Sequence, residues 1–286
     1  MAAKKRRRRL FKDRKDGYLI KPRDPLFKLI PHIMKKRSDA QVFFEDTIDI
    51  TATDRYIKEK RAQGHKNLKL LDVFIASYVR TISQYPEVNR FVTGRKIYAR
   101  SSIATAIAIK KEMTRTAPET PVKVEYDPEA TLFEVSEKLH DAITESRSED
   151  NDAVNFVKAL YYIPNFIIRM LVWFLERLDG LGILPKAFRD MSPFHTGLFI
   201  TDLGSLGINP VYHHIYDFGN TTIFVAFGYK RVGRDGIKRI AVRVVADERI
   251  CDGFALASAI RMFFKFLQKP HLLEEPPKEI FEDDEI

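Results

Sequence analysis

Two carboxylates stand four residues apart near the C-terminal end of this 286-residue chain. Residues 247–253 have the sequence Asp-Glu-Arg-Ile-Cys-Asp-Gly, so that an arginine and two apolar residues separate Glu248 from Asp252 and a glycine follows. The run joins a β-branched stretch at 239–246, a predicted strand, to an apolar stretch at 254–267, a predicted helix. At such a rigidly supported junction one carboxylate can act as a general base while the other orients its neighbours. A polar surface turn is the alternative interpretation.

This run resembles the Asp-His-Arg-x-x-Asp-Gly signature of the dihydrolipoamide acyltransferases of 2-oxoacid dehydrogenase complexes. Chloramphenicol acetyltransferase shares the signature as His-x-x-x-Asp-Gly. The chain departs from it at one position, because the catalytic His of the family corresponds to Glu248. In the family this base takes a proton from the acceptor and passes it to the departing coenzyme A thiolate. Glutamate has a reference pKa of about 4.3 against about 6.5 for histidine, so only buried surroundings that raise its pKa would make Glu248 an adequate base.

Three interpretations of the replaced histidine stay open. Glu248 can serve as the base if burial raises its pKa. His213 or His214 can serve instead, although adjacent side chains of an extended segment face opposite ways and only one of them can face a given cleft. Packing or surface histidines are the alternative for this pair. In the third interpretation the chain is a scaffold or regulatory relative with weak or no catalysis.

The resemblance assigns roles to two further residues. Residues 198–208 begin as a strand and end in a glycine-punctuated turn, and they are similar to the family segment Phe-Thr-Ile-Ser-x-Leu-Gly, whose hydroxyl stabilises the oxyanion. Thr201 occupies that position and keeps the donor; an ordinary threonine at a strand end is the alternative. The signature aspartate of the family pairs with an arginine of the N-terminal segment and braces the loop. Asp252 takes this place, with Arg23 or Lys28 as the partner.

The elements around these residues predict an α+β fold, because their order fits a layered fold better than a regular alternation of parallel units. Apolar spacing predicts helices at 25–36, 51–63, 68–84, 131–146 and 254–267, and strands at 41–50, 89–92, 96–100, 104–110, 121–126, 221–229 and 239–246, with another beginning at 198. The resemblance covers residues 23–275. It implies a two-layer sandwich of the chloramphenicol acetyltransferase type, with a mixed sheet and helices packed on one face.

Charge divides the chain into three parts, within a net charge of +9. Residues 1–22 hold ten Lys and Arg against two acidic residues, and 270–286 hold seven Asp and Glu against one Lys. We expect a basic flexible arm, an acyltransferase-like domain at 23–269 and an acidic C-terminal tail. Through residues 4–15 the arm can contact an anionic membrane surface or an acidic protein, and nucleic acid is less favoured. No apolar segment follows the basic run, which excludes a secretory signal.

An apolar run at 153–185 has no counterpart in the family, which has only a short connection here. Pro164 and Asn165 split it, and charged residues cut it below the roughly 20 apolar residues that a membrane span needs. One interpretation is a helical pair buried in the fold or at an oligomer interface. The other is an interfacial helix, or a hydrophobic wall for a long acyl chain.

The resemblance implies acyl transfer between coenzyme A and a thiol, hydroxyl or amine acceptor, with Glu248, Thr201 and Asp252 as the site. Trimers are the unit of the family, and the two substrates enter a channel between subunits from opposite ends. The residues before Arg23 are too few for a lipoyl or subunit-binding domain, so we expect no lipoyl group on this chain. The alternative function is a catalytically weak or inactive trimeric scaffold that binds an anionic surface through its basic arm.

Cysteine and histidine usage bounds the compartment and the cofactors. Cys251 is the single cysteine, so an intrachain disulfide is excluded and a reducing compartment is favoured. We therefore expect a cytoplasmic protein that can associate with a membrane through its arm. No cluster of His and Cys stands at metal-ligand spacing, and we expect no metal.

Overall fold

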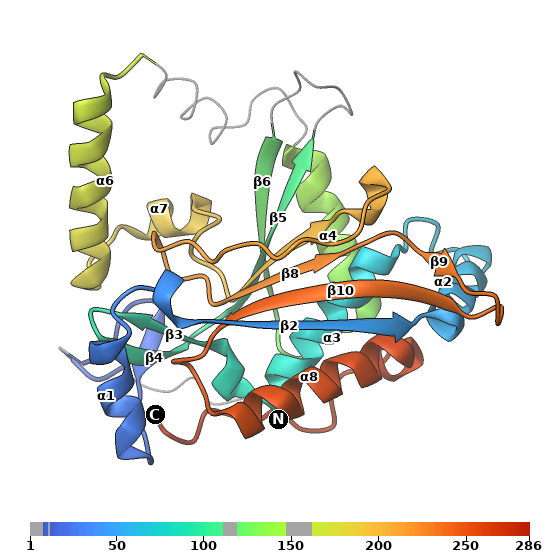
Figure 1. Cartoon of the computed structure of the whole chain (residues 1–286), viewed down its shortest axis with the longest axis horizontal. Coiled ribbons are helices and arrows are strands. Elements are labelled where there is room, and N and C mark those ends of the chain that lie inside the picture. Colours follow the sequence, from blue (N-terminus) through green and yellow to red (C-terminus); the bar gives the residue numbers. More distant parts are fainter. Residues whose placement is uncertain (1–7, 11, 111–118, 147–161) are drawn as a thin grey trace.

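A mixed sheet forms the centre of the computed structural model, which describes residues 8–10, 12–110, 119–146 and 162–286. The strand order is β2-β10-β8-β7-β5-β6, and β9 pairs with β10 beside this path (Figure 1). Strands β5, β7 and β8 run parallel, whereas β2, β6 and β10 are antiparallel to their neighbours. The strands are β2 (Gln41–Asp49), β5 (Ile103–Lys110), β6 (Glu119–Tyr126), β7 (Leu198–Asp202), β8 (Ile223–Phe227), β9 (Arg231–Val232) and β10 (Lys238–Asp247).

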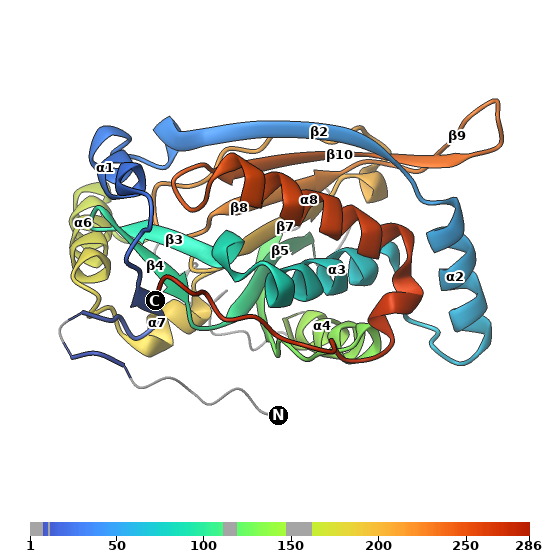
Figure 2. The ribbon, with the colours of Figure 1, turned by 90° about the horizontal axis from the view of Figure 1, so that it is seen from below.

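Helices cover one face of this sheet, as Figure 2 shows from below. They are α3 (Leu70–Gln84), α4 (Leu132–Ser146) and α8 (Gly253–Gln268), and α2 (Thr51–Ala62) lies at the end of this layer against α3 and α8. Helix α3 is buried along almost its whole length, and Phe74 stacks on Phe227 of β8 with ring centroids 4.4 Å apart. Apolar burial of this kind is the main force that holds a helix to a sheet. The expected α+β sandwich, with a mixed sheet and helices on one face, is confirmed.

A small antiparallel sheet of order β1-β4-β3 and the helix α1 (Pro25–Ile33) lie beside the main sheet. Its strands are β1 (Gly17–Leu19), β3 (Arg90–Thr93) and β4 (Lys96–Arg100), and short 3-10 turns occur at Ser38–Ala40, Pro86–Asn89, Gly204–Leu206 and Pro270–Leu273. The expectation of a flexible arm over residues 1–22 is wrong for residues 12–22. Arg14 is buried and pairs with Asp16 and with Asp179, and β1 pairs with β4.

The acidic C-terminal segment lies along the domain (Figure 2). The amide of Phe281 donates to the carbonyl of Ser83, and Asp283 forms a buried ion pair with Arg90 at 2.6 Å. The amide of Lys21 also donates to the carbonyl of Glu285. The segment is therefore held by specific contacts with both α3 and the small sheet.

Helix α6 (Asn165–Gly180) lies in the predicted insertion at 153–185 and stands at one edge of the molecule (Figure 1), and helix α7 (Lys186–Met191) follows directly after the insertion. The partner of α6 in the predicted helical pair falls in residues 147–161, outside the described ranges. Large apolar side chains of α6 are exposed, including Trp173 at 54%. A helix buried within its own chain is therefore wrong for α6. No helix in the described ranges has the length and hydropathy to cross a bilayer.

Candidate active site

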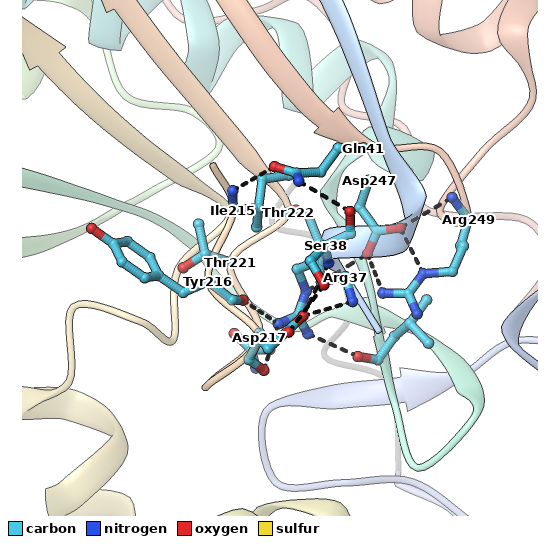
Figure 3. Close-up of polar contacts among 12 residues, drawn as sticks. Arg37, Ser38, Gln41, Ile215, Tyr216, Asp217, Thr221, Thr222, Asp247 and Arg249 are labelled. Atoms are coloured by element: carbon cyan, nitrogen blue, oxygen red, sulfur yellow. Dashed lines mark hydrogen bonds and ion pairs between the residues drawn. The ribbon is translucent and has the colours of Figure 1, made fainter. Parts of the chain in front are cut away.

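The loop between β10 and α8 is anchored by a buried carboxylate. Asp247 ends β10 and is 1% exposed. Its two oxygens accept from Nε and Nη2 of Arg249 at 2.7 and 2.6 Å, and Nε of Arg37 lies 3.6 Å away (Figure 3). Arg249 also donates to the carbonyl of Met34 at 2.9 Å. A buried carboxylate held between two guanidinium groups fixes where the following residue, Glu248, leaves the sheet.

Arg37 connects this loop to a second loop. Its guanidinium donates to the carbonyls of Tyr216, Asp217 and Gly219 at 2.7–3.1 Å, and its amide donates to the Asp217 carboxylate at 2.9 Å (Figure 3). Burial lowers the pKa of Arg37, and the carboxylate of Asp247 opposes that shift. Sequence inspection missed this residue, because a lone arginine after two lysines gives no local signal of burial.

Glu248 itself faces outward. Its amide donates to the carbonyl of Ala40 at 2.9 Å, which ties the loop to the start of β2. Its side chain is exposed, and it forms no hydrogen bond or ion pair within the described part of the chain. The chain therefore presents this carboxylate at its surface. Within the described residues, nothing encloses the side chain of Glu248.

Asp252 caps α8. Its carboxylate accepts from the amide of Ala255 at 2.8 Å, which satisfies one of the free donors in the first turn of the helix. The expected partner Arg23 instead pairs with Asp284 at 2.6 Å on the surface. The expected brace between Asp252 and Arg23 or Lys28 is not formed in the described residues. The structural role of Asp252 is helix capping.

Replacing Asp252 by Ala should lower the free energy of unfolding by about 1 kcal/mol, the usual cost of a lost N-cap. Asp252→Ser, which keeps a side-chain acceptor, should lower it by much less. Urea denaturation of both variants checks this expectation. Equal losses in the two variants would contradict the capping role.

Thr201 lies far from Glu248 within one chain. On β7 the side chains of Leu198 and Ile200 enter the main core, so Phe199 and Thr201 face the side of the sheet without helices. Thr201 pairs with Ala226 of β8, which pairs with Arg243 of β10. Glu248 follows Arg243 by five residues, so the two groups are more than about 15 Å apart along the sheet. The hydroxyl of Thr201 is half-buried and forms no hydrogen bond in the described residues.

Solved structures share this architecture. A probable dihydrolipoamide acetyltransferase from Listeria monocytogenes 4b F2365 matches with a TM-score of 0.53 and 16% identity, covering 87% of this chain and 94% of that chain. A truncated catalytic core of the 2-oxoacid dehydrogenase multienzyme complex from Thermoplasma acidophilum gives 0.56 and 15%, covering 88% and 98%. A chloramphenicol acetyltransferase gives 0.54 and 14%, with the same coverage.

The chain has the chloramphenicol acetyltransferase fold. No family model and no curated protein matches its sequence. At identities of 12–16% the likeness establishes the fold, and the site has to be argued from its own residues.

On this acetyltransferase fold the two candidate histidines pack against aromatic rings. His213 stacks on Phe224 of β8 with centroids 4.4 Å apart, and burial lowers its pKa. His214 meets the edge of the Tyr216 ring, with centroids 5.0 Å apart. Phe224, which His213 contacts, and Ala226, which pairs with Thr201, are two residues apart on β8 and therefore lie on the same face of the sheet. His213 and Thr201 thus lie on the same face of the sheet.

The remaining chemistry-bearing residue of the loop is Cys251. It is buried, and burial raises its pKa to about 12. Its thiol is therefore not a nucleophile at neutral pH. Across the described ranges, no group of three or more His, Cys, Asp and Glu side chains is arranged to hold a metal ion.

Proposed function

We propose that the chain is a coenzyme A-dependent acyltransferase whose active site forms between two copies. The observation that carries the proposal is the separation of Thr201 from Glu248 on an acyltransferase-type fold. Each residue has an unused functional group at or near the surface, and more than about 15 Å of sheet lies between them. One acyl carbon can contact both residues only if they come from different subunits.

Exposed apolar side chains support self-assembly through the sheet face without helices. Phe43 of β2 is 56% exposed and meets the edge of Tyr212 at 5.5 Å. Leu206, Ile208 and Val211 are also exposed. The carbonyl of Ile208 accepts a hydrogen bond from the amide of Tyr229, just after β8. Several exposed apolar side chains on one side of a sheet are consistent with a protein contact. A solved structure of the same fold (TM-score 0.53, 13% identity) is the cubic core of a pyruvate dehydrogenase complex, and we propose a trimer here.

The proposed mechanism requires a base that transfers one proton and a hydrogen-bond donor that stabilises one oxyanion. Glu248 accepts the proton of the attacking thiol, hydroxyl or amine, and the new bond forms at the thioester carbonyl carbon. Thr201 of the neighbouring copy donates a hydrogen bond to the resulting oxyanion. The tetrahedral intermediate then expels coenzyme A, and Glu248 returns the proton to the departing thiolate. In the proposed trimer, the neighbouring subunit would exclude water from Glu248, whose side chain is exposed in the single chain.

Calorimetric titration with acetyl-coenzyme A and a longer acyl-coenzyme A tests this proposal, followed by release of free thiol with a panel of acceptors. We expect both thioesters to bind, and Glu248→Gln to slow thiol release by about 10²-fold or more with binding unchanged. Glu59→Gln, an exposed glutamate on α2, is the matched control and should leave the rate unchanged. Absence of binding by either thioester would overturn the catalytic proposal.

The second candidate is a weakly catalytic or inactive trimeric scaffold that binds an anionic surface. The exposed carboxylate in the place of the family histidine favours it. Salt-sensitive binding that is lost on deleting residues 1–8, without loss of acyl transfer, would support this candidate. This deletion leaves the buried pair of Arg14 and Asp179 in place. The absence of a lipoyl group and the cytoplasmic location remain predictions.

A further inference from the structure

Helix α6 presents an apolar stripe to solvent. Phe166, Met170 and Trp173 follow one another at helical spacing and are 71%, 62% and 54% exposed. The half-buried side chains that face the fold, such as Leu171 and Leu175, lie on the opposite side of the helix. The helix is thus apolar on both sides, and among the described residues only one of these sides is covered.

Helix α1 presents a second stripe. Leu26, Leu29 and Ile33 lie on one side of this helix and are 53%, 53% and 65% exposed, while Pro31 on the other side is buried. Both helices lie at the same edge of the molecule in Figure 1 and in Figure 2. A cavity of about 440 Å³ has walls from the C-terminal half of α6 and from residues 35–37, which follow α1.

The surface between and around the two stripes is basic. Arg177 lies over the ring of Trp173 at 5.3 Å. Over the two helices, their caps, residues 34–37 and the walls of the cavity, the exposed acidic residues are Asp24, Glu176 and Asp217. The exposed cations of the same set are Lys28, Lys35, Lys36, Arg95, Arg169 and Arg177.

Arg14 of the N-terminal segment binds the end of α6. It donates to the backbone carbonyl and to the carboxylate of Asp179, in the last turn of α6. In the sequence, two lysines and four arginines at residues 4–9 precede Arg14 by five to ten residues.

We propose that this surface, the α1–α6 face, docks on an anionic lipid bilayer. Aromatic and aliphatic side chains of an amphipathic helix enter the boundary between headgroups and acyl chains, and flanking lysines and arginines bind lipid phosphates. The face supplies both elements, with two apolar stripes framed by cations. Tryptophan beside arginine is suited to this boundary, since the ring has an apolar body and a polar N–H.

The charge of the face disfavours the other occupants. A second copy packed on the same patch would bring like charges together, since a two-fold contact pairs a surface with itself. The acidic C-terminal segment cannot supply the complement freely, because its Asp283 and Asp284 already pair with Arg90 and Arg23. Nucleic acid would satisfy the cations through its phosphates but would leave the apolar stripes in water.

Trp173 is the only tryptophan of the chain, so its fluorescence reports on α6 alone. The full-length protein is mixed with vesicles of phosphatidylcholine, either pure or with about one third phosphatidylglycerol. We expect the anionic vesicles to shift the emission to the blue, to protect Trp173 from acrylamide, and to sediment with the protein. Raising the salt concentration should weaken this binding, because the surface charges are screened.

Two variants keep Trp173 as the reporter. Met170→Glu, one turn away on the same stripe, should lower vesicle binding by about tenfold or more. Val232→Glu is the matched control, because Val232 is 65% exposed on β9 at the opposite end of the molecule (Figure 1), and it should leave binding unchanged. The double variant Lys35→Glu/Lys36→Glu should weaken binding by about 30-fold or more. Circular dichroism confirms that each variant is folded.

Three results would overturn the proposal. The first is an absence of binding to the anionic vesicles. The second is an equal effect of Met170→Glu and Val232→Glu on binding. The third is a blue shift of Trp173 on raising the protein concentration without vesicles, which would assign the α1–α6 face to contact between copies of the chain.

Discussion

Replacing Asp247 by Asn should lower the free energy of unfolding by about 3–5 kcal/mol. Both oxygens of this carboxylate accept from Arg249, and Arg37 lies within ion-pair distance. All three side chains are buried, so the neutral amide leaves two guanidinium groups without their counter-charge in a medium that solvates them poorly. Equilibrium unfolding in urea, followed by circular dichroism, measures the change.

Asp235→Asn is the matched control for this effect. Asp235 also pairs with an arginine, Arg239, at 2.6 Å, but both side chains are largely exposed. A surface ion pair contributes about 0–1 kcal/mol, so this variant should differ little from the wild type. If Asp247→Asn cost no more than Asp235→Asn, the buried charge cluster could not be what holds the loop of Glu248.

Mixing two inactive variants should restore acyl transfer. We expect Glu248→Gln and Thr201→Val each to lose about 10²-fold or more of the activity, by loss of the base and of the oxyanion donor respectively. If each site takes one residue from each of two neighbouring subunits, random mixing leaves about a quarter of the sites intact. Co-refolding equal amounts of the two variants and measuring thiol release tests this expectation.

Each variant refolded alone is the control and should remain inactive. Mixed oligomers are verified by a tag on one variant. If verified mixed oligomers showed no recovery, Thr201 and Glu248 would not act together across a subunit boundary. Such a result would leave the binding proposal for the α1–α6 face untouched, because that test measures vesicle binding rather than activity.

The regular elements of the fold could be predicted because their signals are local. Alternation in 41–50 and 239–246 anticipated β2 and β10, and the helical spacing in 68–84 anticipated α3, each within two residues of the observed ends. Strand β1 was missed, since Gly17–Leu19 is three residues long and lies in a basic segment. Its structure depends on pairing with β4, about eighty residues away in the sequence, and no local pattern records such a partner.

The site was predictable in its residues but not in their arrangement. The motif spacing placed Glu248 and Asp252 on the loop between β10 and α8, where they lie. Burial, partners and separation depend on contacts between distant segments. Asp252 caps a helix, Glu248 is exposed, and the sheet register separates Thr201 from both. The buried role of Arg37 comes from three loops that converge only in the folded chain.

That convergence bears on how the candidate base moves. One guanidinium binds carbonyls of the segment 216–219 and lies against Asp247, while Arg249 reaches back to Met34. These segments cannot open one at a time without breaking buried charge contacts, so their amide hydrogens should exchange with solvent as a single cooperative unit. The loop that carries Glu248 is therefore rigid. An incoming substrate meets a carboxylate that is already in position, and binding does not have to order the loop.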